Sequence, residues 1–241
     1  MKIQRTFASV LSGFALFLSI GTGVSQIFVT NPNGIASSDQ LTWSGFGDDH
    51  FFSNPFQASS KNGTVVTFME SGSDPYISTI YQAPVVGSGG GLNGNFTPST
   101  LVLDVYYGST ITLSFPNGIY GGGAQFAVPT TTPSGAGPFT AQIVAYGQNN
   151  NLLATFSGSG NFSAAADNSA PFFGILDSTP DIYSISFTGL TAHYSTYLGN
   201  FEFFAPAPEP ATLSLVGPGL LALLAMKRKR TRSKGVSPDY S

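Results

Sequence analysis

Few residues of this 241-residue chain could do acid–base or metal chemistry. It has two histidines, His50 and His193, and no cysteine, which excludes thiol catalysis, disulfides and cysteine-ligated zinc. His50 follows Asp48 and Asp49 in the segment GDDHFF, but zinc needs three or four convergent ligands and successive residues of a strand diverge. We therefore expect a turn with a solvated acidic face here, and a protein that is not an enzyme.

Two further kinds of chemistry stay open. An exported hydrolase would need a cleft that joins His50 or His193 to an acid and a serine. Calcium could bind to carboxylates and carbonyls in loops, either at Asp48 and Asp49 or at Asp177 and Asp181, although no EF-hand motif is present. We expect no other cofactor.

Aromatic side chains offer a different kind of binding, because exposed rings can stack on sugars. For each such ring, packing in a core is the more common outcome, so we expect core packing first and a sugar platform as the alternative. The candidate platforms are Trp43, Tyr106, Tyr107, Tyr194 and Tyr197.

The charge distribution argues against nucleic-acid binding. Only 9% of the residues are charged, where a typical soluble domain has about 25%. Between residues 26 and 205 there are ten acidic residues, and Lys61 is the only basic residue. A surface so poor in Lys and Arg cannot neutralise phosphates, so we expect no nucleic-acid partner.

The basic residues gather instead behind an uncharged segment near the end of the chain. Residues 211–226 carry no charge and would form a helix about 24 Å long, close to the thickness of a hydrocarbon core. A basic cluster then spans 227–234, which fits the positive-inside rule for a stop-transfer signal. Its first four residues are Lys227, Arg228, Lys229 and Arg230.

A Pro-Glu-Pro motif precedes this segment. Its residues are Pro208, Glu209 and Pro210. Proline lacks an N–H donor and resists helix formation, so we expect the motif to be extended beside the membrane. Together, PAPEP, the apolar run with GPGLLALLA, and KRKR resemble the PEP-CTERM sorting signal of bacterial exported proteins, here over residues 206–232.

The PEP-CTERM resemblance implies a partner and a destination. An exosortase would recognise Pro208, Glu209 and Pro210, the following helix would hold the chain transiently in the inner membrane, and the basic residues would stop transfer. The resemblance also implies an association with exopolysaccharide and biofilm. Residues 233–241 would form a short cytoplasmic tail.

The first 25 residues have the pattern of a secretory signal peptide. Lys2 and Arg5 form a positive head, residues 7–20 are apolar and uncharged, and small residues lead to Ser25. We expect export through the Sec translocon and cleavage after Ser25.

The body, residues 26–205, shows a period of two. In the segment DIYSISFTG, Tyr183, Ile185 and Phe187 alternate with hydroxyl residues, which is typical of a half-buried strand. About ten such strands predict an all-β, antiparallel β-sandwich of jelly-roll type. The expected strands are 64–68, 100–107, 109–115, 124–128, 139–146, 152–156, 172–176, 181–189 and 200–204, with a hairpin loop at 147–151.

Two glycine-rich segments, 87–95 and 120–125, lack the lysine of a phosphate-binding loop. We expect both to be turns. Phenylalanines are the expected core residues, among them Phe126, Phe156, Phe173, Phe187 and Phe203.

The sequence leads to one main functional hypothesis and two alternatives. The main one is a non-enzymatic exported protein of the cell surface or extracellular matrix, sorted and processed by an exosortase. The first alternative is a carbohydrate-binding β-sandwich with a polysaccharide partner, and the second is an exported hydrolase.

Overall fold

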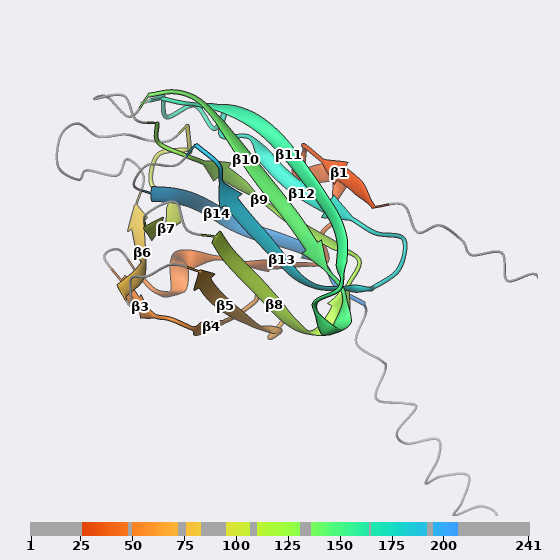
Figure 1. Ribbon diagram of the computed structural model, residues 1–241. Coiled ribbons are helices and arrows are strands. Elements are labelled where there is room, and N and C mark those ends of the chain that lie inside the picture. The colour runs from red at the N-terminus through yellow and green to blue at the C-terminus, as the bar shows by residue number, and fades with distance from the viewer. Residues whose placement is uncertain are drawn as a thin grey trace, which may run out of the picture.

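The computed structural model describes residues 26–47, 50–71, 76–82, 95–106, 110–130, 136–163, 165–191 and 195–206. Two antiparallel sheets pack face to face over these residues, so the predicted all-β, antiparallel sandwich is confirmed (Figure 1). The jelly-roll connectivity stays a prediction. The helices within the described ranges are three 3₁₀ turns, η1 (Pro32–Gly34), η2 (Trp43–Gly45) and η3 (Gln148–Asn150).

The first sheet has six strands in the order β11-β10-β13-β8-β5-β4. They are β4 (Phe56–Ser59), β5 (Val65–Ser71), β8 (Thr110–Ile119), β10 (Gly137–Tyr146), β11 (Leu152–Phe162) and β13 (Ile182–Gly189). All neighbours in it are antiparallel. The hairpin between β10 and β11 turns at η3, where the loop at 147–151 was predicted.

The second sheet has eight strands, in the order β1-β12-β9-β14-β7-β6-β3, with β2 paired to the C-terminal half of β14. They are β1 (Ile27–Val29), β2 (Asp39–Leu41), β3 (His50–Ser53), β6 (Tyr76–Gln82), β7 (Leu101–Tyr106), β9 (Gly121–Ala127), β12 (Phe172–Leu176) and β14 (Ser195–Phe204).

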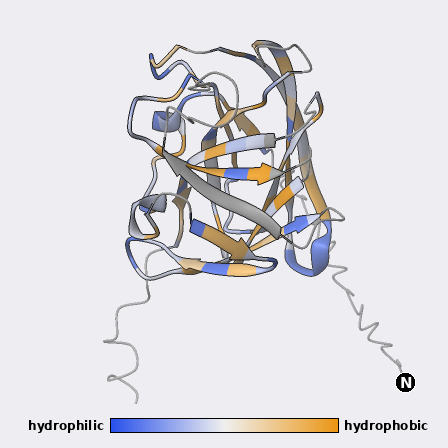
Figure 2. Cartoon of the chain, turned by 90° about the vertical axis from the view of Figure 1, so that its left-hand side faces the viewer, coloured by the Kyte–Doolittle hydropathy of each residue, from blue (hydrophilic) through white to orange (hydrophobic). Residues whose placement is uncertain are grey.

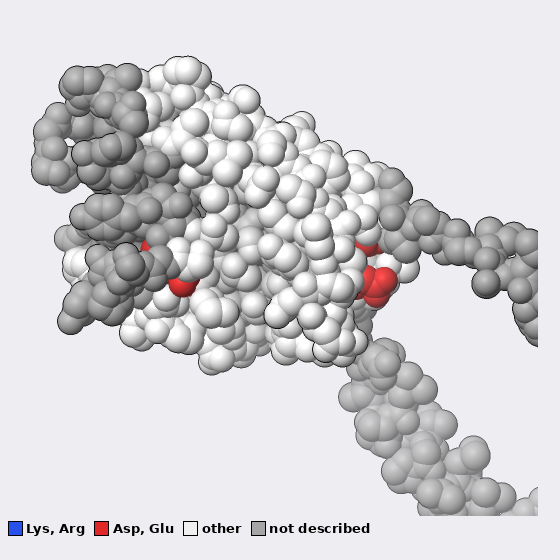
Figure 3. All heavy atoms as spheres, in the orientation of Figure 1, with Lys and Arg blue, Asp and Glu red and all other residues white. Residues whose placement is uncertain are grey.

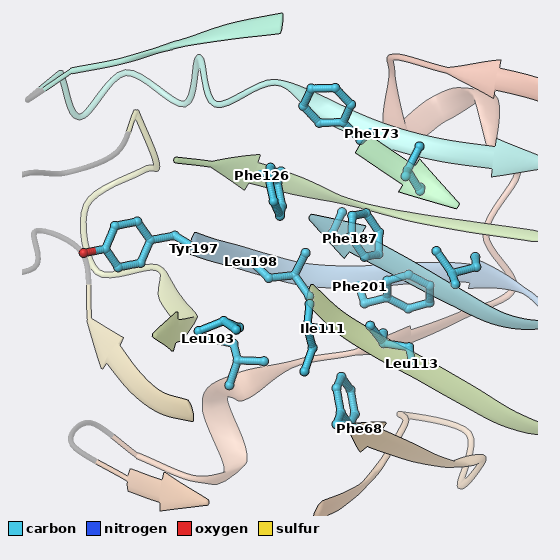
Figure 4. Packing of buried hydrophobic residues seen from close by; sticks show 14 of the residues in the cluster. Phe68, Leu103, Ile111, Leu113, Phe126, Phe173, Phe187, Tyr197, Leu198 and Phe201 are labelled. Atoms are coloured by element: carbon cyan, nitrogen blue, oxygen red, sulfur yellow. The ribbon is translucent and has the colours of Figure 1, made fainter. Parts of the chain in front are cut away.

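Rings and aliphatic side chains fill the space between the sheets. Phe126, Phe187 and Phe201 are fully buried, and Phe187 meets Phe201 edge to face (Figure 4). Four of the five predicted core phenylalanines are buried, and Phe156 is partly buried against the same cluster. The period-two pattern explains this, because alternate residues of each strand point to the same face. Figure 2 shows the alternation as changes of hydropathy along the strands.

The predicted turn at 120–125 is wrong, because Gly121–Gly123 open strand β9. They are glycines because their neighbours are so close. A Cβ on Gly123 would lie 2.6 Å from the Phe173 carbonyl oxygen, and one on Gly122 would overlap the ring of Phe201. Composition alone cannot distinguish a flexible glycine run from one that admits a tightly packed partner.

Several predictions fall on other residues. The signal peptide, the sorting motif, the C-terminal segment and most of the 87–95 segment lie outside the described residues. Within the described residues, no helix has both the length and the apolar character to cross a membrane.

Candidate functional site

The outward face of the six-stranded sheet is the most regular polar surface of the protein. Strand β8 directs Thr110, Thr112 and Ser114 outward, because Ile111, Leu113 and Phe115 between them are buried in the core. On the neighbouring strand β13, Ser184, Ser186 and Thr188 lie in register with them, but Ser184 and Ser186 are buried and only Thr188 is partly exposed. We call the outward-pointing residues of β4, β5, β8, β13, β10 and β11 the hydroxyl face.

The register aligns this face in rows that cross the strands. One row runs through Gln57, Thr67, Ser114, Ser184 and Tyr146. The next runs through Met69, Thr112, Ser186, Val144 and Thr155. The third runs through Ser71, Thr110, Thr188, Gln142 and Ser157. Neighbours in a row are separated by the strand spacing of about 4.8 Å.

Hydroxyls in the centre of the face hydrogen-bond in pairs. The Oγ1 atoms of Thr110 and Thr188 lie 2.6 Å apart, and Thr112 Oγ1 lies 2.8 Å from Ser186 Oγ. Thr67 Oγ1 accepts a bond of 3.3 Å from the Gln57 amide. A hydroxyl can donate one bond and accept two, so the partly exposed threonines keep capacity for an outside partner, whereas Ser186 is buried. Because β-branched threonine has few χ1 rotamers, the pairs are also well oriented.

Apolar groups adjoin the hydroxyl rows. Tyr146 is half-buried at the end of the first row, next to Ser184. Met69 is 53% exposed at the other end of the second row, whereas Val144, which continues that row on β10, is buried. The face therefore offers both hydrogen-bonding groups and apolar surface.

No charged side chain points outward from these six strands. Glu70 of β5 is buried on the inward side, and Lys61, in the loop between β4 and β5, is the one basic residue in the described part of the chain. The view in Figure 3, with β8, β10, β11 and β13 toward the reader, shows a broad white surface with acidic atoms only near its ends. The site is thus electrostatically neutral.

Of the five predicted aromatic platforms, the structure describes the side chains of Trp43 and Tyr197. Trp43 is fully buried, and its Nε1 donates to the carbonyl oxygens of Leu198 at 3.2 Å and Gly199 at 3.0 Å. Tyr197 is 9% exposed, and its ring stacks on Phe162. Both rings pack in the core, which confirms the expected core packing and excludes the alternative role of these two residues as sugar platforms. The side chains of Tyr106, Tyr107 and Tyr194 lie outside the described residues.

The acid–base candidates do not come together in the described residues. His50 is exposed, with its ring against Phe46 and Phe52. Asp48, Asp49 and His193 lie outside the described residues. No group of three or more His, Cys, Asp or Glu side chains suited to a metal occurs among the residues described.

The second predicted calcium pair is linked through a threonine. Thr179 Oγ1 donates at 2.8 Å to Asp181 and lies 3.2 Å from Asp177 Oδ1. Gln26 donates to the other Asp177 oxygen at 2.8 Å. Asp177 is buried, and its carboxylate closes the turn before β13. The geometry gives this pair a structural role, and calcium binding stays a prediction.

Two other acids are perturbed, and both lie away from the hydroxyl face. Hydrogen bonds from the Ser169 side chain and backbone lower the pKa of Asp167. Burial raises the pKa of Glu202 on β14. Neither group contributes a charge to the candidate site.

The alternation of hydroxyl and apolar residues in 181–189 was visible in the sequence, but it did not by itself predict the hydroxyl face. It placed Ser184, Ser186 and Thr188 on one side of a strand without showing which strands lie beside it. Strand order is a long-range property, so the rows become visible only when the register is known.

Comparison with known proteins assigns no family. No protein-family model and no curated protein matches the chain. Among solved structures, a DUF4465 family protein from Bacteroides caccae has 12% identity and a TM-score of 0.40, covering 74% of this chain and 99% of its own. CsCBM6-3 from Clostridium stercorarium, solved with cellobiose, has 13% identity and a TM-score of 0.23 and covers 71% and 95%. Likenesses this weak assign no ligand to this chain.

Proposed function

We propose that the body of this protein is a non-catalytic module that binds a neutral polysaccharide on the hydroxyl face. The observation that carries the proposal is the uncharged, hydroxyl-bearing surface across all six strands of one sheet. This was the first alternative from the sequence, but it now rests on a sheet face instead of on buried aromatic rings.

The chemistry of the face matches such a ligand. A neutral polysaccharide presents many hydroxyl groups and no charge, so it needs donors and acceptors more than it needs ions. The hydroxyl rows supply both from the same atoms. Sugar rings also have apolar C–H faces, and Tyr146 and Met69 offer surfaces on which these faces can pack.

The lack of carboxyl groups on the hydroxyl face also suits binding without catalysis. Hydrolysis of a glycosidic bond requires two carboxyl groups on either side of the bond, and the hydroxyl face has none. The many weak contacts of such a surface favour an extended polymer, because each repeat adds to the total affinity.

The terminal segments complete the proposal. The signal peptide would export the chain, and an exosortase would recognise Pro208, Glu209 and Pro210 and release the body to the cell surface or matrix. A protein delivered to the cell surface or matrix would be surrounded by polysaccharide. This part is supported by the sequence motifs of residues 1–25 and 206–232.

The test removes two hydroxyls without changing the shape of the face. Thr110→Val and Thr112→Val are made together, since valine matches the size of threonine and suits a strand. We expect the exported double variant to bind the neutral fraction of the producing cell's extracellular polysaccharide about tenfold more weakly. Affinity electrophoresis measures this.

Thr42→Val is the matched control. Thr42 Oγ1 pairs with Ser44 Oγ at 3.1 Å, so it also belongs to a threonine–serine pair, but it precedes η2 beside the other sheet. Its binding should equal that of the unmodified protein. Equal binding by the double variant and the control, or binding only to acidic polysaccharide, would refute the proposal.

A further inference from the structure

The ends of the two sheets differ greatly in length. Strands β1 and β2 have three residues each, and β3 and β4 have four. Strand β11, at the end of the six-stranded sheet, has eleven residues, and among the described strands it pairs with β10 alone. Short edge strands are one way in which proteins prevent sheets from joining. Four edges of this protein have that protection, and β11 does not.

Strand β11 also lacks the other common protections. Its sequence, LLATFSGSGNF, has no charged residue and no proline. Its register with β10 shifts once, near the start, and is then regular from Ala154 to Phe162. On the side of β11 away from β10, N–H and C=O groups therefore run along a long edge that is not paired with any described strand.

We propose that β11 pairs antiparallel with β11 of a second copy of this chain. The sequence of the strand suits a two-fold axis near Ser157. With the axis at Ser157, the Phe156 ring of one copy lies opposite Gly158 of the other, so that a large side chain meets an empty position. Ser159 then lies opposite Thr155 on the outward side, and two hydroxyl residues are paired as in the centre of the sheet.

The residues of β11 leave room for this pairing without rearrangement of the core. Phe156 already stacks on Phe28 with ring centroids 5.4 Å apart, so its ring is held in place. Gly158 lies against Phe173, and Gly160 lies against Phe139. Side chains at these two glycines would crowd the end of the sandwich beside the edge.

Pairing has a direct consequence for the surface. The two six-stranded sheets would become one continuous sheet, and the outward rows would cross from one copy into the next through Thr155 and Ser157. Two binding faces joined in this way engage one polymer with a higher effective concentration. The pairing itself does not depend on the proposed ligand.

The absence of cysteine makes a crosslinking test clean. Ser157→Cys and Ser159→Cys are introduced singly into the full exported protein. Under mild oxidation, we expect a disulfide-linked dimer from Ser157→Cys alone or from a mixture of the two variants, which places the axis at residue 157 or 158. Thr112→Cys, at the centre of the same face, should give no disulfide-linked dimer.

A charge on the edge gives an independent readout. Ser157→Lys should turn the dimer seen by sedimentation into a monomer with unchanged circular dichroism. Ser59→Lys, on the short edge strand β4, is the matched control and should stay dimeric. A wild-type protein that sediments as a monomer and gives no crosslink overturns the proposal, while its polysaccharide binding would be unaffected. A dimer that survives Ser157→Lys places the interface elsewhere and overturns it as well.

Discussion

At the scale of single residues, the two candidates that proved buried show why ring type does not predict a binding platform. Trp43 combines a large apolar area with one N–H donor. The backbone carbonyls of Leu198 and Gly199 lie within its reach, so the fold satisfies the donor internally. Without knowledge of those carbonyls, the sequence could not separate this outcome from an exposed tryptophan.

We expect Trp43→Phe to lower the free energy of unfolding by about 2 kcal/mol. It removes the indole N–H that bonds Leu198 and Gly199 and leaves a small cavity beside Phe68. Urea denaturation measures the change. Phe51→Ala is the control, because Phe51 is 67% exposed and should change stability by less than about 0.5 kcal/mol. Equal effects of the two substitutions would show that Trp43 is not held as described.

Glu202 predicts a pH dependence of stability. Because burial raises its pKa in the folded state, its ionised form disfavours folding, and the folded protein gains stability as the pH falls through that raised pKa. Glu202→Gln removes the ionised form. It should therefore raise the melting temperature at pH 7 by about 1 °C, a small change because solvent screens a partly exposed group.

The difference should disappear at acidic pH, below the pKa of glutamate in the unfolded chain. Calorimetry measures the melting temperatures of both proteins at pH 7, where we expect the difference, and at pH 3, where we expect none. An equal shift at the two pH values would assign the effect to packing or hydrogen bonding and not to charge.

At the scale of elements, the strand pattern was predictable and the glycines were not. Alternation in residues 181–189 correctly placed Ile185 and Phe187 in the core, and it put Ser184 and Ser186 on the other side of the strand, where both prove to be buried. The same reasoning missed short strands such as β1 and β2, because three residues are too few to show a period. It treated Gly121–Gly123 as a turn, because no neighbouring residue in the sequence indicates that Phe201 packs over Gly122.

Gly158 tests the close packing of β11 on the core. We expect Gly158→Ala to destabilise the protein by about 1–3 kcal/mol, since the added methyl would overlap the ring of Phe173. Gly45→Ala is the control, because a Cβ there has nothing within 4 Å. Thermal unfolding measures the stability of both variants, and we expect only Gly158→Ala to be destabilised. A neutral Gly158→Ala would mean that the ring of Phe173 moves aside easily.

At the scale of the whole molecule, the predicted cellular location depends on terminal sequence motifs, whereas the proposed polysaccharide binding depends on the folded sheet. The terminal segments that predict export and sorting can be read as linear motifs, since a translocon or transpeptidase meets them as extended chain. The hydroxyl face combines residues from Gln57 to Thr188, and no stretch of sequence contains it. The sequence shows that residues 26–205 are poor in Lys and Arg and hold ten acidic residues, but it does not show that one sheet face is uncharged.

The sorting hypothesis makes its own prediction. Glu209→Ala should block processing, so that the full-length precursor accumulates in the inner membrane; gel mobility and mass spectrometry of the new terminus detect this. Glu202→Ala is a control for loss of a glutamate elsewhere and should mature normally. Normal maturation of Glu209→Ala would contradict recognition of Pro208, Glu209 and Pro210 as a motif.

The most direct test of the central claim is methyl NMR of threonine during titration of the exported protein with oligosaccharides from the neutral extracellular polysaccharide. Thr67, Thr110, Thr112 and Thr188 report on the hydroxyl face, and Thr42 and Thr179 report on regions outside it. We predict saturable shifts at the first four and none at the other two. Shifts at Thr42 or Thr179 with an unchanged face, or no shift at any of the six, would contradict the proposal that this sheet face binds the polymer.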